Sequence, residues 1–95
     1  MPTLLIRHRV EDYAAWKAAF DQHAAARRAN GSQGGRLFRN VADPNDVVIL
    51  LAWDLLERAR LFADSDDLRE AMARAGVTTP TPDIWFLEET DRPAV

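Results

Sequence analysis

Cysteine is absent from this sequence of 95 residues, and lysine occurs once, at Lys17. Without cysteine the chain has no disulfide framework, no thiolate metal site and no thiol nucleophile. No apolar run approaches the roughly 18 residues that a membrane span needs. Residues 1–7 lack the basic and apolar segments of a secretory leader. We therefore expect a soluble, cytoplasmic protein with no membrane partner.

The charged residues exclude further partners. The net charge is −3 and both signs are mixed along the chain, which disfavours nucleic acid as a partner because phosphate contacts need a clustered basic surface. His8 and His23 stand fifteen positions apart with no convergent carboxylate, so their spacing argues against a metal site. The pair Gly34-Gly35 lacks the rest of a phosphate-binding motif. We expect no metal and no cofactor.

What is present is a short, apolar chain. Hydrophobic residues make up 47% of it, which rules out disorder. The length fits a single domain over residues 1–95, in which residues 90–95 form a loose tail. A domain of this size buries only a modest core, so a partner surface would add stability.

The segment between Asp46 and Asp54 organises the prediction. Its seven residues, Val47 to Trp53, are all apolar and rich in β-branched and aromatic types. Such a run is short for a helix and does not alternate, so it predicts a strand covered on both faces. Other parts of the fold must therefore pack against both faces of this strand.

A first helix and three more strands surround this segment. Asp12 is a suitable helix N-cap and Gly31 a suitable helix end. Aromatic and apolar residues at spacings of three and four between them predict an amphipathic helix. Pro80 and Pro82 precede the last strand and suit an edge position. The three strands are expected at residues 3–9, 36–42 and 84–88.

A second helix follows the central strand. Asp54 and Glu57 have capping-box spacing, which predicts that this helix begins there. We expect it to break near Asp64 and to restart with Ser65 as the cap. Gly76 then ends it in a Schellman-type stop.

The segment 43–46 predicts a tight turn, because Pro44 takes the second turn position between Asp and Asn residues. With Pro44-Asn45 as the loop, antiparallel pairing places Arg39 opposite Leu50 and Val41 opposite Val48. Arg36, Phe38 and Asn40 then share the helix-covered face with alternate residues of the central strand. The opposite face would carry Leu37, Arg39, Val41, Val48, Leu50, Ala52 and Asp54.

The expected order is βαββαβ, an α+β ferredoxin-like fold with a four-stranded antiparallel sheet. Right-handed crossovers place both helices on one face of this sheet. The other face stays bare and apolar, and no chain remains to cover it. We therefore expect a homodimer that packs two open sheet faces together, in the manner of a dimeric α/β barrel.

His8 and Arg39 are the candidate catalytic residues. The unperturbed pKa of histidine lies near neutrality, so His8 suits proton transfer, although a buried histidine satisfied by backbone has the same pattern. Arg39 stands among apolar neighbours, where an unpaired charge is costly. Its partner is a substrate carboxylate or enolate, or else a carboxylate such as Asp54, Glu88 or one from the partner subunit. The predicted faces leave open whether His8 and Arg39 lie together.

Four further residues are candidates for substrate binding. Asn40 can donate to a substrate carbonyl or pair with neighbouring strands. The tryptophans suit the wall of an aromatic pocket or ordinary core packing. His23 is expected at the surface or an interface. The three tryptophans are Trp16, Trp53 and Trp85.

Motifs along nearly the whole chain resemble those of small bacterial proteins of the dimeric α/β-barrel superfamily, which are related to the antibiotic-biosynthesis monooxygenases and often labelled cyclases. This resemblance implies a barrel of two sheets, with a pocket between each sheet and its helices or inside the barrel. It also implies cofactor-independent cyclase, isomerase or monooxygenase chemistry on an aromatic or polyketide-like substrate. Relatives often carry an acidic residue where this chain has Ala52, so the departure argues against a carboxylate acid or base there. The motifs are Val10-x-Asp12-Tyr13-x-x-Trp16-x-x-x-Phe20-Asp21, Phe38-Arg39-Asn40, Leu51-x-Trp53-Asp54, Ala59-x-x-Phe62-x-x-Ser65-x-x-Leu68-x-x-x-Met72 and Phe86-Leu87-Glu88.

Two other functions fit the same element order. One is a non-catalytic small-molecule-binding or accessory domain. The other is an amino-acid-binding regulatory module or an RNA-binding domain. The regulatory module is weakened because residues 10–12 run into the helix without a glycine-bearing ligand loop. RNA binding would need aromatic residues on the open face, where the predicted register places aliphatic ones.

Overall fold

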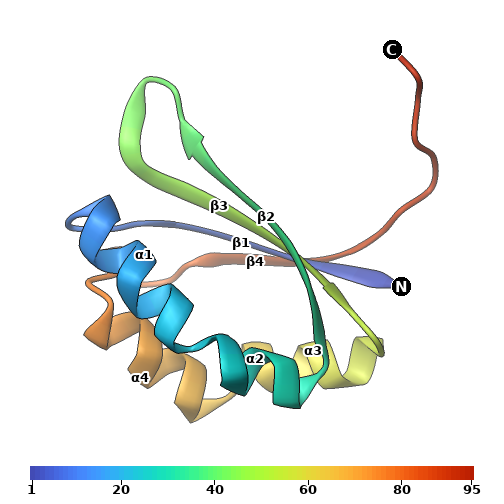
Figure 1. Cartoon of the computed structure of the whole chain (residues 1–95), viewed down its shortest axis with the longest axis horizontal. Coiled ribbons are helices and arrows are strands. Elements are labelled where there is room, and N and C mark those ends of the chain that lie inside the picture. The colour runs from blue at the N-terminus through green and yellow to red at the C-terminus, as the bar shows by residue number, and fades with distance from the viewer.

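A computed structural model describes all 95 residues (Figure 1). Each of the two predicted helical regions is divided into two helices. No helix is long and apolar enough to cross a membrane. The elements are β1 (Pro2–Arg9), α1 (Tyr13–Gln22), α2 (Ala24–Asn30), β2 (Ser32–Asn40), β3 (Asp43–Trp53), α3 (Leu56–Ala63), α4 (Asp66–Arg74) and β4 (Asp83–Glu88).

The four strands form one antiparallel sheet in the order β2-β3-β1-β4. All four helices lie on one face of it, as the ribbon in Figure 1 shows. This arrangement confirms the predicted ferredoxin-like fold. It also confirms that the last strand, β4, is an edge strand.

The caps of α1 and α2 agree with the sequence, but the helix between them is interrupted. The carboxylate of Asp12 accepts a hydrogen bond from the backbone N–H of Ala15 at 2.9 Å. Gly31 ends α2 with φ of 119°, a conformation that favours glycine. The interruption falls at His23, which ends α1 and precedes α2.

The region of α3 and α4 breaks where expected. The predicted capping box does not form, because the Asp54 carboxylate accepts from the N–H of Leu55 and pairs with Arg58 instead. The Ser65 hydroxyl caps α4 by accepting from the N–H of Leu68 at 3.1 Å. The helix thus restarts at the predicted cap.

The end of α4 is the predicted Schellman stop, and it ties α4 to β1. The N–H of Val77 donates to the Met72 carbonyl and the N–H of Gly76 to the Ala73 carbonyl. Val77 then bridges to Val10. Backbone hydrogen bonds from Glu11 to Gly76 and from Thr78 to Arg9 complete the connection. The last turn of α4 is therefore fixed beside the C-terminal end of β1.

The predicted register of the β2–β3 hairpin is wrong by three residues. Arg39 pairs with Val47 rather than Leu50, and Phe38 pairs with Val48. The Asn40 side chain accepts a hydrogen bond from the N–H of Ala42, so the chain reverses at residues 41–42 and Pro44 lies inside β3. Because side chains alternate along a strand, an odd shift moves each β2 residue to the opposite face.

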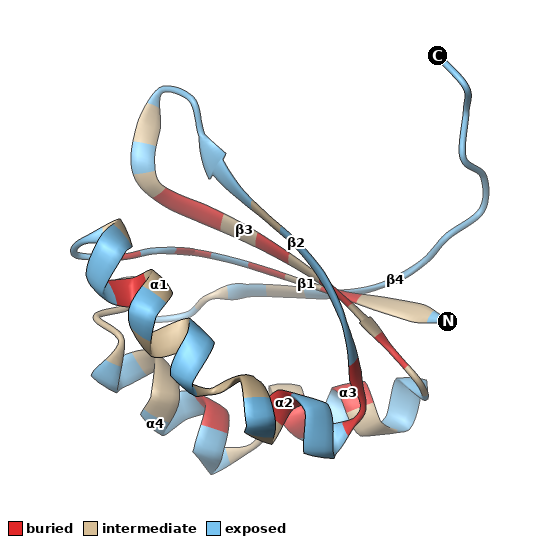
Figure 2. Ribbon diagram, in the orientation of Figure 1, coloured by how far each residue is buried: buried red, intermediate tan, exposed pale blue.

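The core lies between the sheet and the helices (Figure 2). Alternate residues of β1 and β3 are buried there, as the parity of both strands predicts. The shifted register adds Leu37 of β2 to this side, where it packs against the core. The buried apolar residues are Leu4, Ile6, Val10, Trp16, Val47, Ile49, Leu51, Trp53, Ala59, Phe62 and Leu68.

The open face of the sheet is more aromatic than the sequence predicts. Phe38 of β2 and Trp85 of β4 lie on it and are 45% and 60% exposed. Val41, predicted on this face, is in the turn and fully exposed. The C-terminal residues 89–95 run away from the sheet (Figure 1). The apolar residues of this open face are Leu5, Phe38, Val48, Leu50, Ala52, Trp85 and Leu87.

One buried carboxylate joins three strands on this face. Asp46 of β3 accepts hydrogen bonds from Arg7 Nε and Nη2 of β1 at 3.1 and 2.8 Å, and from Asn40 Nδ2 of β2 at 3.1 Å. These hydrogen bonds, Arg7 first and Asn40 second, lower the pKa of Asp46 from 3.8 to about 2. The interaction fixes the register at the hairpin end of the sheet.

Asp46→Asn should lower the free energy of unfolding at pH 7 by about 2 kcal/mol, since one pKa unit corresponds to about 1.4 kcal/mol. The native pKa is depressed, so this contribution is complete above about pH 4 and is lost as the pH falls through about 2. Urea unfolding from pH 7 to pH 2, at one protein concentration, measures it. Asp66 forms an exposed ion pair with Arg69, so the control Asp66→Asn should change stability little. If the free energies of unfolding of Asp46→Asn and the wild type changed equally with pH, the stabilising role assigned to Asp46 would be contradicted.

Candidate functional site

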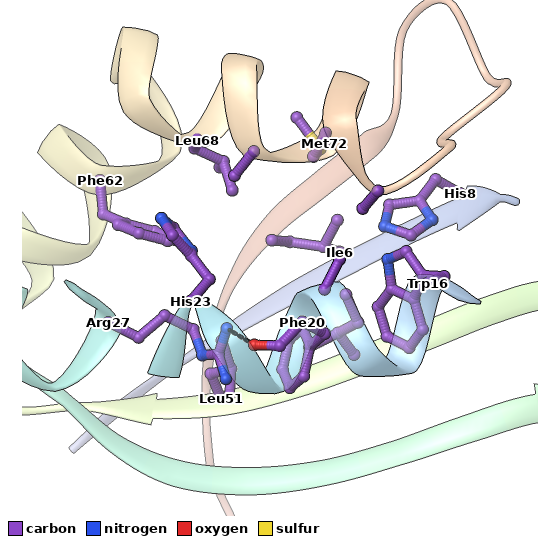
Figure 3. Close-up of a pocket in the computed structure, with 14 residues that line it drawn as sticks. Ile6, His8, Trp16, Phe20, His23, Arg27, Leu51, Phe62, Leu68 and Met72 are labelled. Atoms are coloured by element: carbon purple, nitrogen blue, oxygen red, sulfur yellow. Dashed lines mark hydrogen bonds between the residues drawn. The ribbon is translucent and has the colours of Figure 1, made fainter. Parts of the chain in front are cut away.

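A small apolar cavity lies between the sheet and helices α1 and α4 (Figure 3). Its volume is about 40 Å³, room for a few water molecules but smaller than the roughly 150 Å³ of a cavity that takes up benzene. Eleven of its fourteen lining residues are hydrophobic. The three polar lining residues are His8, His23 and Arg27. We call this space the inner cavity.

His8 lies at one end of the inner cavity. It follows Leu4 and Ile6 on the buried face of β1, and it is only 3% exposed. Its ring packs edge-on against Trp16, with centroids 5.7 Å apart. Its Nδ1 atom is buried and has no hydrogen-bond partner. Burial lowers the pKa of His8, and its own backbone and the Asp46 charge oppose this only in part. The imidazole is therefore neutral near pH 7.

Helix α1 supplies an aromatic wall. Tyr13, Trp16 and Phe20 recur at spacings of three and four and so share one face of the helix. The centroids of Tyr13 and Trp16 are 5.6 Å apart, and those of Trp16 and Phe20 are 5.0 Å apart. Such a wall suits a planar, apolar ligand.

His23 and Arg27 lie at the other end (Figure 3). His23 stands at the junction of α1 and α2, and its Nε2 is 2.8 Å from Oδ2 of Asp67 in α4. Arg27 is 8% exposed. Its Nη1 donates to the Phe20 carbonyl at 2.7 Å, and its guanidinium carbon lies 3.6 Å from the Phe20 ring centroid. Burial lowers the pKa of Arg27, and the charge of Asp21 opposes this shift.

Arg39 shares the helix-covered face with His8, contrary to the predicted faces. His8 pairs with Val47, and Val47 pairs with Arg39, so the three form one row across the sheet. With strands about 4.8 Å apart, the two outer Cα atoms are separated by about 10 Å. Arg39 is exposed and stacks over Tyr13 at 4.3 Å, outside the inner cavity.

The other predicted substrate-binding residues are dispersed. Trp16 lines the inner cavity beside His8. Asn40 bonds Asp46 on the open face. Trp53 is buried against Phe62, with an unpartnered Nε1, and does not line the cavity. Trp85 lies on the open face.

Sequence reasoning missed His23 and Arg27 as site residues. Both continue the helical spacing that begins at Tyr13, and that continuation was the available indication. A polar residue at the end of an apolar helix face is equally typical of a solvated helix end, so the pattern alone could not place them. Across the molecule, no three histidine or acidic side chains come together as metal ligands would.

Comparison with known proteins identifies the fold. No family model and no curated protein matches the sequence. Solved structures do match over nearly the full chain. A candidate antibiotic biosynthesis monooxygenase from Bordetella bronchiseptica superimposes with a TM-score of 0.76 at 19% identity, covering 94% of this chain and 96% of that one. SnoaB, a cofactor-independent oxygenase from Streptomyces nogalater, gives 0.75 at 16% identity, covering 99% and 97%.

This chain has their fold. A further structure described as an antibiotic biosynthesis monooxygenase gives a TM-score of 0.69 at 10% identity, covering 96% of this chain and all of that one. The matches confirm the fold that the sequence motifs imply.

Folding stability should depend on the protonation of His8. Because burial lowers its pKa in the folded chain, its contribution is complete above about pH 6.5 and is lost as the pH falls through the native value. In His8→Leu, which has no titrating group there, the decline between pH 7 and pH 5 should be smaller. Thermal or urea unfolding at several pH values measures this difference. His23→Gln is the control and should retain the decline due to His8, whereas an equal decline in His8→Leu would contradict this environment.

Proposed function

We propose that this chain is a cofactor-independent enzyme of the oxygenase type that acts on an aromatic or polyketide-like small molecule in the inner cavity. His8 is its general base. The observation that carries the proposal is the buried imidazole of His8, whose Nδ1 has no hydrogen-bond partner and whose ring packs against Trp16. The structural similarity to SnoaB supports oxygenase chemistry over other reactions of an anion.

The chemistry begins with a proton transfer. A neutral imidazole accepts the proton of a phenol or of an enolisable carbon next to a carbonyl group. The apolar wall keeps water from competing for that proton. When the proton leaves a methylene carbon, the carbanion bonds to dioxygen and takes up one proton to give a hydroperoxide. This hydroperoxide loses water and leaves a carbonyl group, so the substrate itself supplies the four electrons that reduce dioxygen. Without dioxygen, the same anion leads to a cyclase or isomerase reaction.

Two other residues have roles in the proposed reaction. Trp16 holds the ring of the substrate beside His8, since both line the inner cavity. Arg39 is a positioning residue: it stacks on Tyr13, whose ring packs in turn on Trp16. Because the inner cavity holds only a few water molecules, side chains must move to admit a substrate. Phe20 and Met72 line it and are only half-buried.

His8→Gln should reduce turnover by about 100-fold or more, the usual contribution of a general base. The assay measures dioxygen uptake and product formation with polycyclic phenols and naphthols, in the presence of a chelator. Arg74→Gln, at an exposed position of α4 outside the inner cavity, is the control and should keep wild-type turnover. Saturable binding without turnover of any compound would favour the alternative, a non-catalytic small-molecule-binding domain.

We further propose that a second copy of this chain covers the open face. Phe38, Trp85 and Leu87 expose large apolar side chains there. The C-terminal tail borders this face only beside Thr3, Leu50 and Ala52. Monomeric proteins seldom leave so continuous an apolar surface in water. A two-fold dimer would bury the same face on both subunits.

The solution mass should therefore be twice the 10.7 kDa of one chain in analytical ultracentrifugation at micromolar concentration. A double variant, Phe38→Glu with Trp85→Glu, should sediment as a folded monomer, because it places charges in the interface. Leu61 on α3 is equally apolar and 72% exposed but lies away from the open face, so Leu61→Glu should remain a dimer. A wild-type monomer would refute the homodimer.

A further inference from the structure

A second, wider hollow lies on the outer side of the inner cavity. It runs between helices α1 and α2 and the N-terminal half of β2, and its volume is about 530 Å³. We call it the outer groove. Gly35 lets β2 pass close to β3 at its floor: a Cβ atom there would lie 1.8 Å from the Leu50 carbonyl oxygen.

The outer groove is strongly basic although the chain as a whole is acidic. Its one carboxylate, Asp21, is already bound by Lys17 Nζ at 2.6 and 2.7 Å. Arg27, Arg28 and Arg36 also line it, and none of the three has a carboxylate within ion-pair distance. An anion in this groove would meet an uncompensated positive charge.

Arg27 connects the outer groove with the inner cavity. Phe20, Arg27 and Leu51 line both spaces. Arg27 is 8% exposed, and the only hydrogen bond of its side chain is to the Phe20 carbonyl. A guanidinium is a planar fork of five donors that matches a carboxylate. A buried guanidinium bound to one carbonyl and one ring face therefore leaves most of that capacity unused.

We propose that the inner cavity and the outer groove form one bipartite site for an aromatic carboxylic acid. The ring lies in the inner cavity beside Trp16, and the carboxylate binds Arg27 from the groove. This inference rests on the proposed function, since it uses the cavity that holds His8, and it adds the class of the substrate: an acid rather than a neutral arene.

Binding of two matched probes, 2-naphthoate and its neutral amide 2-naphthamide, tests the proposal by calorimetry with the full-length protein. The wild type should bind the acid at least tenfold more tightly than the amide. In Arg27→Met, which keeps the buried stem and removes the charge, the two affinities should differ by less than about twofold. Arg74→Met removes an exposed arginine of α4 outside both spaces and should keep the wild-type preference.

Equal affinity of the wild type for both probes would overturn the proposal, whether or not Arg27→Met folds. A preference for the acid that persists in folded Arg27→Met would also overturn it. NMR spectra locate the ring: 2-naphthoate should shift the indole N–H resonance of Trp16, and shifts confined to residues of the outer groove would refute the bipartite arrangement. Acid-selective binding without turnover would refute the enzyme and keep this inference. Turnover of neutral arenes, together with equal affinities for 2-naphthoate and 2-naphthamide, would keep the enzyme and refute this inference.

Discussion

The pairing of β1 with β3 at the centre of the sheet determines where every other element lies. β3 carries an unbroken apolar run, so it must be covered on both faces, and β1 is its inner neighbour. The helices cover one face and there bury His8, the one polar residue of the inward row of β1. A slip of β1 by one residue would turn His8 to the open face, away from Trp16. The environment of the candidate base thus follows from strand packing.

Much of the fold could be predicted because local and global preferences agree. The cap at Asp12, the stop at Gly31, the restart at Ser65 and the Schellman end at Gly76 each rest on backbone chemistry within a few residues. The hairpin could not be predicted in the same way. Pro44 gave a strong turn pattern, but the Asn40 side chain organises the reversal two residues earlier. Two local preferences competed, and only long-range pairing decided between them.

The candidate site was predictable in part for the same reason. His8 and Trp16 follow from the parity of a strand and the period of a helix, and the structure brings them into contact. The face of Arg39 depended on the hairpin register, so the incorrect turn placed Arg39 on the open face and left its position relative to His8 undecided. Arg27 could not be predicted from either pattern, because its importance lies in its having no ion-pair partner. A missing partner is a property of three-dimensional packing and leaves no mark in the sequence.

The two ends of the inner cavity are held in very different ways. Near His8, the last turn of α4 is connected to β1 by several backbone hydrogen bonds and a strand bridge. Near Arg27, one side-chain hydrogen bond, between His23 and Asp67, joins the junction of α1 and α2 to α4. The end of the inner cavity near His8 is therefore held by more hydrogen bonds than the end near Arg27. Substitutions at the Arg27 end could then change which ligand is selected during evolution without disturbing the geometry around the imidazole of His8.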